Sequence, residues 1–195
     1  KLRKDMCIEL KRIQEKVGIT FVHVTHNQEE AMTVADDLAI ISAGELVEVG
    51  KARDLYENPV RRFTADFIGE NNIFDGRVTS VDGSTATIDT GYAQLSVDAR
   101  GQKPSVGDQA SISVRSELLR LVDKNAGASD GLQIIPGEHQ ETVYLGLTTS
   151  ELVRLPNGSE IMVRRLSGGF ESRSVGAGEN VEVGWQAGDG RLHLT

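Results

Sequence analysis

The sequence predicts an α/β segment over residues 1–70, followed by an all-β, barrel-like domain over residues 71–195. Helix, strand, helix and strand patterns follow one another in the first segment, as at the end of an α/β domain. In the second, apolar residues alternate with polar ones in ten short runs separated by turn residues, which indicates a small barrel or a pair of barrel-like units. Glycine follows the same division, since 17 of the 21 glycines lie after residue 70.

An amphipathic helix is predicted over residues 2–17, because apolar side chains recur at every third or fourth position and Gly18 suits the position after a helix. The nearly continuous apolar run over residues 19–24 predicts a strand covered on both faces, with His23 packed in the core. We expect the apolar stripe of the helix to be covered by another surface, such as the same stripe of a second copy. The residues of the stripe are Leu2, Met6, Leu10 and Ile13.

A turn over residues 25–27 follows that run, and Asn27 is suited to cap a helix over residues 28–35. The Ala43-Gly44 pair predicts the turn of a hairpin. The remaining predicted elements of this segment are the two hairpin strands, residues 38–42 and 45–49, and two short helices, residues 53–57 and 61–68.

Turn signals such as Asp82-Gly83 and Asn157-Gly158 separate the strands of the second segment. Residues 123–130 are small and polar, and are predicted to form an exposed loop. The ten predicted strands are residues 73–81, 85–89, 94–97, 110–114, 132–136, 141–147, 150–155, 160–165, 180–183 and 191–194.

The composition excludes several classes of protein. A formal charge of −8 argues against binding to nucleic acid, which requires a basic face. The single cysteine, Cys7, excludes a disulfide framework. The sequence has no apolar run near the roughly 20 residues that a membrane-spanning helix needs.

Among the four histidines, His26 is placed most favourably for function. It follows the predicted buried strand and precedes the capped helix, and ligands bind at that end of strands in open α/β sheets. An imidazole there can donate a hydrogen bond to a phosphate oxygen, although the position alone fits a structural role equally well. His139 and His193 have no carboxylate or cysteine cluster around them in the sequence, so no metal site is expected.

The sequence lacks the motifs that bind and cleave a nucleotide. It contains no GxxxxGK[ST] phosphate loop and no strand that ends in paired carboxylates for magnesium. Residues 166–169 (LSGG) match the start of the LSGGQ signature, but Phe170 and Glu171 follow in a setting of strands, so a β-turn is predicted. On its own, the chain is therefore expected to have no ATPase activity.

Residues 20–70 resemble the C-terminal end of the nucleotide-binding domain of ABC transporter ATPases. The family pattern is a strand followed by VTHDQxEA and, further on, by a segment that ends in FIG. This sequence departs from the pattern at Asn27, where the family usually has aspartate. The matching residues are Val24, Thr25, His26, Gln28, Glu30, Ala31, Ala35, Asp36, Gly44, Gly50, Tyr56, Pro59, Phe63, Phe67, Ile68 and Gly69.

The rest of the chain resembles the TOBE-type, OB-like accessory domain of importer ATPases. The segment SVRSELLRL, which begins at Ser113, is similar to the family's VRPEDLRL, and a YLG triplet begins at Tyr144. The junction FIGENNIFDGRV most resembles the spermidine/putrescine branch of the family. Sugar, sulfate and iron importers share this architecture and remain alternatives.

The resemblance implies that residues 1–70 are the C-terminal part of a P-loop nucleotide-binding domain and that the chain is a C-terminal piece. The phosphate loop (Walker A), the signature and the magnesium-binding strand (Walker B) would all precede Lys1. His26 would be the switch-loop histidine, which is both catalytic and in contact with the ATP γ-phosphate. ATP and Mg²⁺ would bind to the longer protein, and neither is expected on this chain alone.

The resemblance also implies the partners: a second copy in a homodimer, transmembrane permease subunits and, indirectly, a substrate-binding protein. The ATPase would lie on the cytoplasmic face of the cell membrane. The β domain would dimerise or regulate, and we expect it to bury apolar strand faces around Trp185 and Tyr144. From another class, the alternative is a non-catalytic regulatory module whose barrel binds a small effector.

Overall fold

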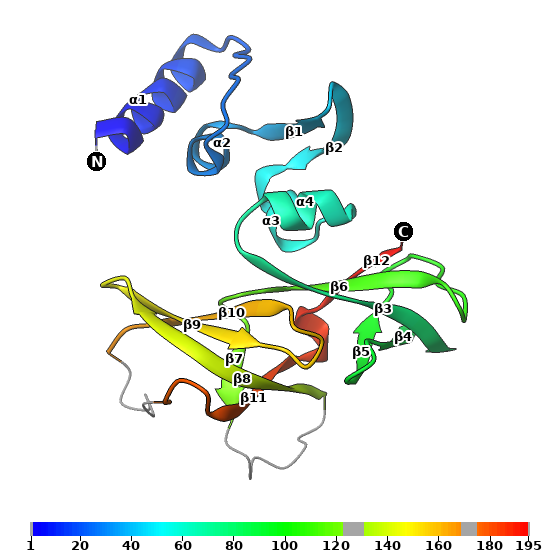
Figure 1. The fold of residues 1–195 in the computed structure, drawn as a ribbon. Coiled ribbons are helices and arrows are strands. Elements are labelled where there is room, and N and C mark those ends of the chain that lie inside the picture. The colour runs from blue at the N-terminus through cyan, green and yellow to red at the C-terminus, as the bar shows by residue number, and fades with distance from the viewer. Residues whose placement is uncertain (1, 123–130, 169–174, 195) are drawn as a thin grey trace. The chain divides into compact units, whose positions relative to one another are not determined.

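The structure is a computed structural model, and it describes residues 2–122, 131–168 and 175–194 (Figure 1). The chain divides into two compact units, Lys1–Gly69 and Glu70–Thr195. The predicted loop over residues 123–130 lies outside the described residues. Each unit is described by itself.

The first unit consists of helices and one antiparallel hairpin. Its helix boundaries lie within about two residues of those predicted, because the periodicity and the capping residues that set them are local. Ala43 and Gly44 form the hairpin turn with positive φ angles of 52° and 81°. Glycine adopts such an angle without strain, whereas alanine does so at a cost. The described elements are α1 (Leu2–Val17), α2 (Gln28–Val34), β1 (Asp37–Ser42), β2 (Glu45–Lys51), α3 (Ala52–Glu57) and α4 (Arg62–Phe67).

The prediction of a buried strand over residues 19–24 is wrong. These residues form neither helix nor strand, and the side chains of Val22 and Val24 are each 90 % exposed. A strand requires a neighbour for its backbone groups, and β1 pairs only with β2 among the described residues of this unit. His23 is consequently not in a core, since 41 % of its side chain is exposed.

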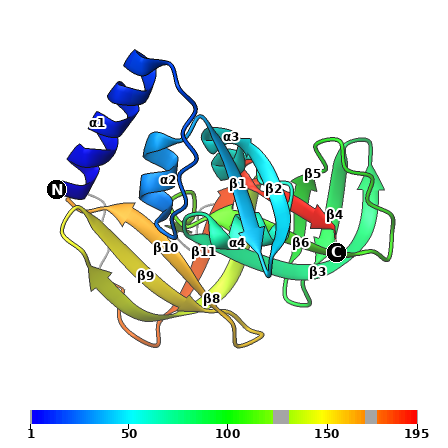
Figure 2. The same ribbon diagram turned by 90° about the horizontal axis from the view of Figure 1, so that it is seen from above.

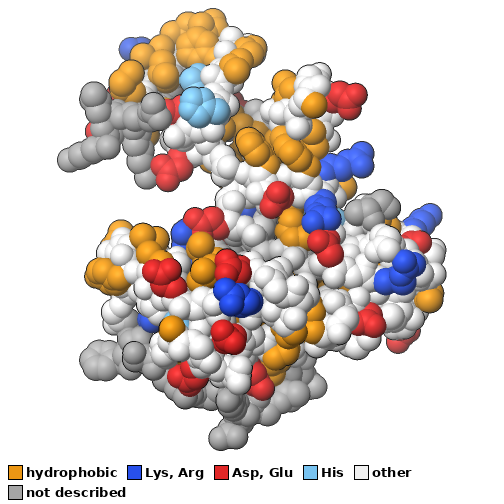
Figure 3. All heavy atoms as spheres, viewed as in Figure 1, with side chains coloured by type: hydrophobic (Ala, Val, Ile, Leu, Met, Phe, Trp, Pro, Cys, Tyr) orange, Lys and Arg blue, Asp and Glu red, His pale blue; other side chains and the backbone are white. Residues whose placement is uncertain are grey.

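The core of the first unit is small. Ile40, Leu55 and Ile68 are buried against one another, and Met32 and Tyr56 pack on them. The described part of the apolar stripe of α1 lies outside this cluster, with Met6, Leu10 and Ile13 exposed. Figure 3 shows hydrophobic side chains gathered on the visible surface of this unit.

The second unit is built from two antiparallel five-stranded sheets (Figure 2). The strand order is β12-β6-β3-β4-β5 in one sheet and β10-β9-β8-β11-β7 in the other. The strands are β3 (Asn71–Asp82), β4 (Thr85–Asp89), β5 (Gln94–Asp98), β6 (Gln109–Arg115), β7 (Arg120–Val122), β8 (Leu132–Tyr144), β9 (Thr148–Arg154), β10 (Glu160–Leu166), β11 (Asn180–Gln186) and β12 (Arg191–Leu194), with a 3₁₀ turn, η1 (Ala187–Asp189).

Two predictions of strands in this unit are corrected. The separate strands predicted over residues 132–136 and 141–147 form one strand, β8, whose pairing with β9 shifts register between His139 and Glu141. A bulge inserts an extra residue without ending the strand, so the local pattern looks interrupted. The short strand β7 was not predicted, and it pairs with β11.

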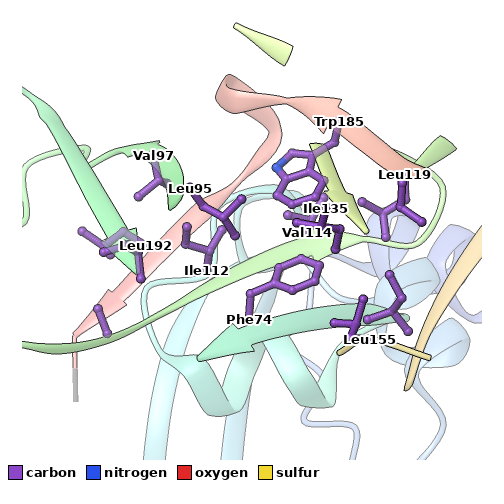
Figure 4. Packing of buried hydrophobic residues seen from close by; sticks show 14 of the residues in the cluster. Phe74, Leu95, Val97, Ile112, Val114, Leu119, Ile135, Leu155, Trp185 and Leu192 are labelled. Carbon is purple, nitrogen blue, oxygen red and sulfur yellow. The ribbon is translucent and has the colours of Figure 1, made fainter. Parts of the chain in front are cut away.

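Both sheets bury their apolar faces in one core. Phe74 of β3 stacks on Trp185 of β11, with ring centroids 5.0 Å apart and planes inclined by 3°. Figure 4 shows the two rings facing each other beside Ile135 and Val114. Trp185 is only 2 % exposed, so the strand face around it is buried, but within the unit itself. Tyr144, in contrast, is 72 % exposed.

The side-chain amides of Asn72 and Gln133 form hydrogen bonds with backbone groups of edge strands. Asn72 of β3 accepts a hydrogen bond from Met162 N (2.7 Å) and donates one to Met162 O (2.9 Å), on edge strand β10. Gln133 of β8 accepts from Ser96 N (2.7 Å) on edge strand β5. In both cases a side chain from one sheet occupies the backbone groups at which another strand would add.

We expect the Asn72→Ala variant to unfold at lower urea concentration, with a loss of about 1–3 kcal/mol, because both backbone groups of Met162 lose their partner. Asn72 is 6 % exposed, so water replaces it poorly. Asn157→Ala is the matched control, since within the described ranges that side chain bonds only to an exposed turn. Equal urea midpoints for the two variants would show that the Asn72 contact does not stabilise the fold.

Candidate functional site

His26 lies on the turn between residues 19–24 and α2. Its side chain is exposed, and within the described part of the chain its ring makes no hydrogen bond or ion pair. The imidazole can therefore donate or accept a hydrogen bond with a ligand without first breaking a contact in the protein. The predicted burial of the preceding residues is absent, but the position of His26 directly before a capped helix is as predicted.

The backbone on either side of His26 is held by a compact set of hydrogen bonds. Asn27 caps α2, since its Oδ1 accepts from Glu30 N at 3.0 Å. Thr25 Oγ1 accepts from Asn27 N at 3.0 Å and donates to Glu30 Oε2 at 2.8 Å. These contacts enclose His26 in a turn of fixed shape, which we call the switch turn (residues 25–27).

Acidic side chains surround the beginning of α2. His23 Nε2 lies 3.9 Å from Glu30 Oε2, and both Glu29 and Glu30 lie in the first helical turn. Carboxylates there interact favourably with the positive end of the helix dipole. No group of three or more metal-binding side chains occurs among the described residues.

The side chain of Gln28 joins the switch turn to the end of the first unit. Its Oε1 accepts a hydrogen bond from Gly69 N at 2.8 Å, and its Nε2 donates to Phe67 O. Gln28 is the first residue of α2, whereas Phe67 and Gly69 flank Ile68, which is buried in the core. No local pattern signals this contact, because 41 residues separate the two partners.

The LSGG segment is a strand end and a turn in its described part. Leu166 ends β10, and Ser167 N donates to Leu147 O at 2.9 Å. Gly169 lies outside the described residues. The predicted β-turn is therefore confirmed as far as Gly168, and that stretch has no helix to present backbone amides to a phosphate.

The second unit contains a cluster of charged side chains around the buried Glu151, which the sequence did not predict. His139 Nε2 lies 3.0 Å from Glu151 Oε2, and Arg165 Nη2 lies 2.9 Å from Glu151 Oε1. His139 therefore has one carboxylate partner, which the sequence did not indicate, and it belongs to no group of three metal-binding side chains among the described residues. Strand pairing brings Glu151 opposite Thr142, next to the bulge at His139, and register cannot be seen in the sequence.

Glu151 is held in its ionised form. Burial alone would raise the pKa of its carboxyl group, but hydrogen bonds from Thr142, His139 and Arg165 outweigh burial and lower the pKa below its usual value. His139 is only 2 % exposed, and its Nδ1 lies 3.2 Å from Gly176 O. The cluster is satisfied by its own members, which is typical of a structural network.

Among the described residues, none of the helices is long and apolar enough to span a membrane.

The second half of the chain matches a known domain family. Residues 112–192 match the TOBE domain. A solved structure of similar fold is the cytoplasmic molybdate-binding protein ModG, with a TM-score of 0.56 and 17 % identity over 66 % of this chain and 99 % of ModG. At this identity the likeness concerns the fold alone, and it confirms the predicted OB-like, TOBE-type architecture.

Nearly the whole chain is similar to curated import proteins. The spermidine/putrescine import ATP-binding protein of Rubrobacter xylanophilus is 40 % identical over 189 residues, which are 96 % of this chain and 48 % of the relative. The protein of the same name from Roseobacter denitrificans is 37 % identical over 98 % of this chain and 52 % of its own length. The chain thus spans about half the length of the curated relatives it matches. These matches confirm the predicted resemblance to ATP-binding subunits of importers.

Proposed function

We propose that this chain, a homologue of the spermidine/putrescine import ATP-binding proteins with a TOBE domain at residues 112–192, is the C-terminal part of the ATP-hydrolysing subunit of an ABC importer for polyamines. Residues 1–70 are then the end of a P-loop nucleotide-binding domain, and residues 71–195 are its accessory β domain. The observation that carries this proposal is the similarity over 96 % of the chain at 40 % identity, which includes both units.

His26 acts in this proposal as the residue that contacts the ATP γ-phosphate and orients the attacking water. Its exposed ring and the hydrogen-bonded switch turn support that role, because the turn holds the backbone that carries the imidazole before a ligand arrives. The remaining nucleotide-binding groups, with Mg²⁺, belong to the part of the subunit that contains the phosphate loop.

The partners follow from the same proposal. Two copies of the subunit sandwich ATP and drive transmembrane permease subunits at the cytoplasmic face of the membrane, which receive their substrate from a binding protein. The uncovered hydrophobic residues of α1 and of residues 19–24 support a larger assembly, because apolar surface of this kind is normally buried against another part of a protein.

The experiment that tests the proposal is uptake by cells that lack their own polyamine ATPase subunit and produce the intact subunit to which this chain belongs. We expect restored uptake of radiolabelled spermidine or putrescine, with no effect on maltose, sulfate or iron in the matching deletion strains. Restoration of one of these other substrates would assign the chain to that branch. Absence of every transport activity, together with heat of binding for a small effector in calorimetry, would favour a non-catalytic regulatory module.

A further inference from the structure

Hydrogen bonds hold the backbone on either side of Gly69, where the chain passes from the first unit to the second. On the side of the first unit, Ile68 is anchored in the core, and Gln28 bonds to Phe67 O and Gly69 N on either side of it. We call the Gln28 contacts the amide clamp. The clamp fixes the backbone up to the amide nitrogen of Gly69.

On the side of the second unit, the backbone is fixed from Glu70 onward. Ser116 N donates to Glu70 O at 3.0 Å, and Arg164 Nη2 donates to Glu70 Oε1 at 2.6 Å. The torsions left between the two sets of contacts are those of Gly69 and the φ angle of Glu70. Gly69 has a φ of 72°, a conformation that glycine adopts at little cost.

We propose that Gly69 is the hinge between the two units and that the Gln28 carboxamide couples this hinge to the switch turn that carries His26. Gln28 directly follows the helix cap Asn27, and the cap, Thr25 and Glu30 are bonded to one another. A displacement of His26 therefore displaces the beginning of α2, and the amide clamp transmits it to Gly69.

The coupling works in both directions. A ligand that holds His26 in one position changes the affinity of the second unit for any partner that fixes it. By linkage, that partner changes the affinity of the ligand at His26 by the same factor. The identity of the ligand as the γ-phosphate of ATP rests on the proposed function. The clamp and the hinge do not, because they are made by this chain alone.

The first test uses the chain of 195 residues. In Gln28→Ala, hydrogen exchange of the Gly69 amide is expected to become at least about fivefold faster, as for the loss of one hydrogen bond that protects an amide. With Cys7 replaced by serine and spin labels at Asp54 and Thr85, the distribution of distances between the two units is expected to broaden.

Two variants separate the clamp from simpler explanations. Gln14→Ala removes another glutamine that donates to a backbone oxygen in the first unit, Ile19 O at 3.1 Å, and should leave both measurements unchanged. Gln28→Glu adds a charge that favours the N-terminus of α2 but removes the donor to Phe67 O. A broadened distribution in Gln28→Glu would therefore come from the clamp rather than from fraying of the helix.

The second test uses the intact ATPase subunit with the same pair of labels. ATP with Mg²⁺ is expected to shift the distance distribution of the native subunit, and Gln28→Ala should abolish that shift. The coupling would be overturned if Gln28→Ala gave the same distribution as the native protein in the chain of 195 residues, or the same shift with ATP as the native intact subunit, even if Gly69 exchanges faster. Polyamine uptake and hydrolysis by the native subunit report separately on the proposed function, so the failure of one idea is distinguishable from the failure of the other.

Discussion

Under the proposed function, replacement of His26 by alanine in the intact subunit is expected to lower the rate of ATP hydrolysis by about 10²-fold or more. A group that donates to charge developing in the transition state, or that positions the attacking water, contributes this much in other enzymes. The effect should fall mainly on kcat, because the phosphate loop and the base-binding residues of the longer protein supply the ground-state affinity for ATP.

The structure separates this loss from a loss of folding. His26 is exposed and makes no contact that another described residue needs, whereas the switch turn is held by Thr25, Asn27 and Glu30. His26→Ala should therefore unfold within about 0.5 kcal/mol of the native protein, as is usual for surface substitutions. Thermal unfolding of both proteins measures this directly.

His23→Ala is the matched control for this experiment. His23 lies three residues before His26, is also partly exposed, and lies near Glu30 rather than on the switch turn. Its replacement is expected to change hydrolysis by less than about twofold, since a surface change of this kind perturbs little else. Near-normal hydrolysis by His26→Ala, or an equal loss in His23→Ala, would remove His26 from the mechanism.

Local patterns in the sequence predicted most of the helices, the hairpin and the helix cap. The boundaries of α1 follow from its apolar period and Gly18, and Asn27 caps α2 because its side chain competes well for the free amides of the first turn. Interactions between distant segments could not be predicted in this way. Residues 19–24 have the composition of a buried strand, but a strand also needs neighbours.

In the candidate site, too, local features could be predicted and contacts between distant segments could not. The sequence identified His26 and its position before the helix, whereas the amide clamp of Gln28 and the charged cluster around Glu151 depend on contacts 41 and 12 residues apart. The bulge in β8 also hid the pairing that brings His139 to Glu151. Periodicity reports which face of an element is apolar, and it carries no information on strand register.

Trp185 is the residue for which the structure most changes the prediction. The resemblance led us to expect that dimerisation or regulation would bury the strand faces around Trp185 and Tyr144, but Trp185 is stacked on Phe74 inside the core of its own unit, at 5.0 Å between ring centroids. We expect Trp185→Ala to destabilise the chain by about 3–5 kcal/mol, the usual cost of removing a large buried aromatic side chain and leaving a cavity. That loss is a large part of the total stability of about 5–15 kcal/mol that is typical of such domains.

Urea unfolding followed by circular dichroism measures this loss, because Trp185 is the single tryptophan and its fluorescence disappears with the substitution. Tyr144→Ala provides the comparison, and we expect it to shift the free energy of unfolding by less than about 0.5 kcal/mol, since the ring is exposed.

The two hypotheses for Trp185 give opposite results. A role in the core predicts a lower urea midpoint at every protein concentration, whereas a role in an interface predicts an unchanged midpoint for the monomer and weaker self-association. Only the first is compatible with a ring that both sheets of the second unit enclose, so a stable Trp185→Ala monomer would contradict the packing of the two sheets around Phe74.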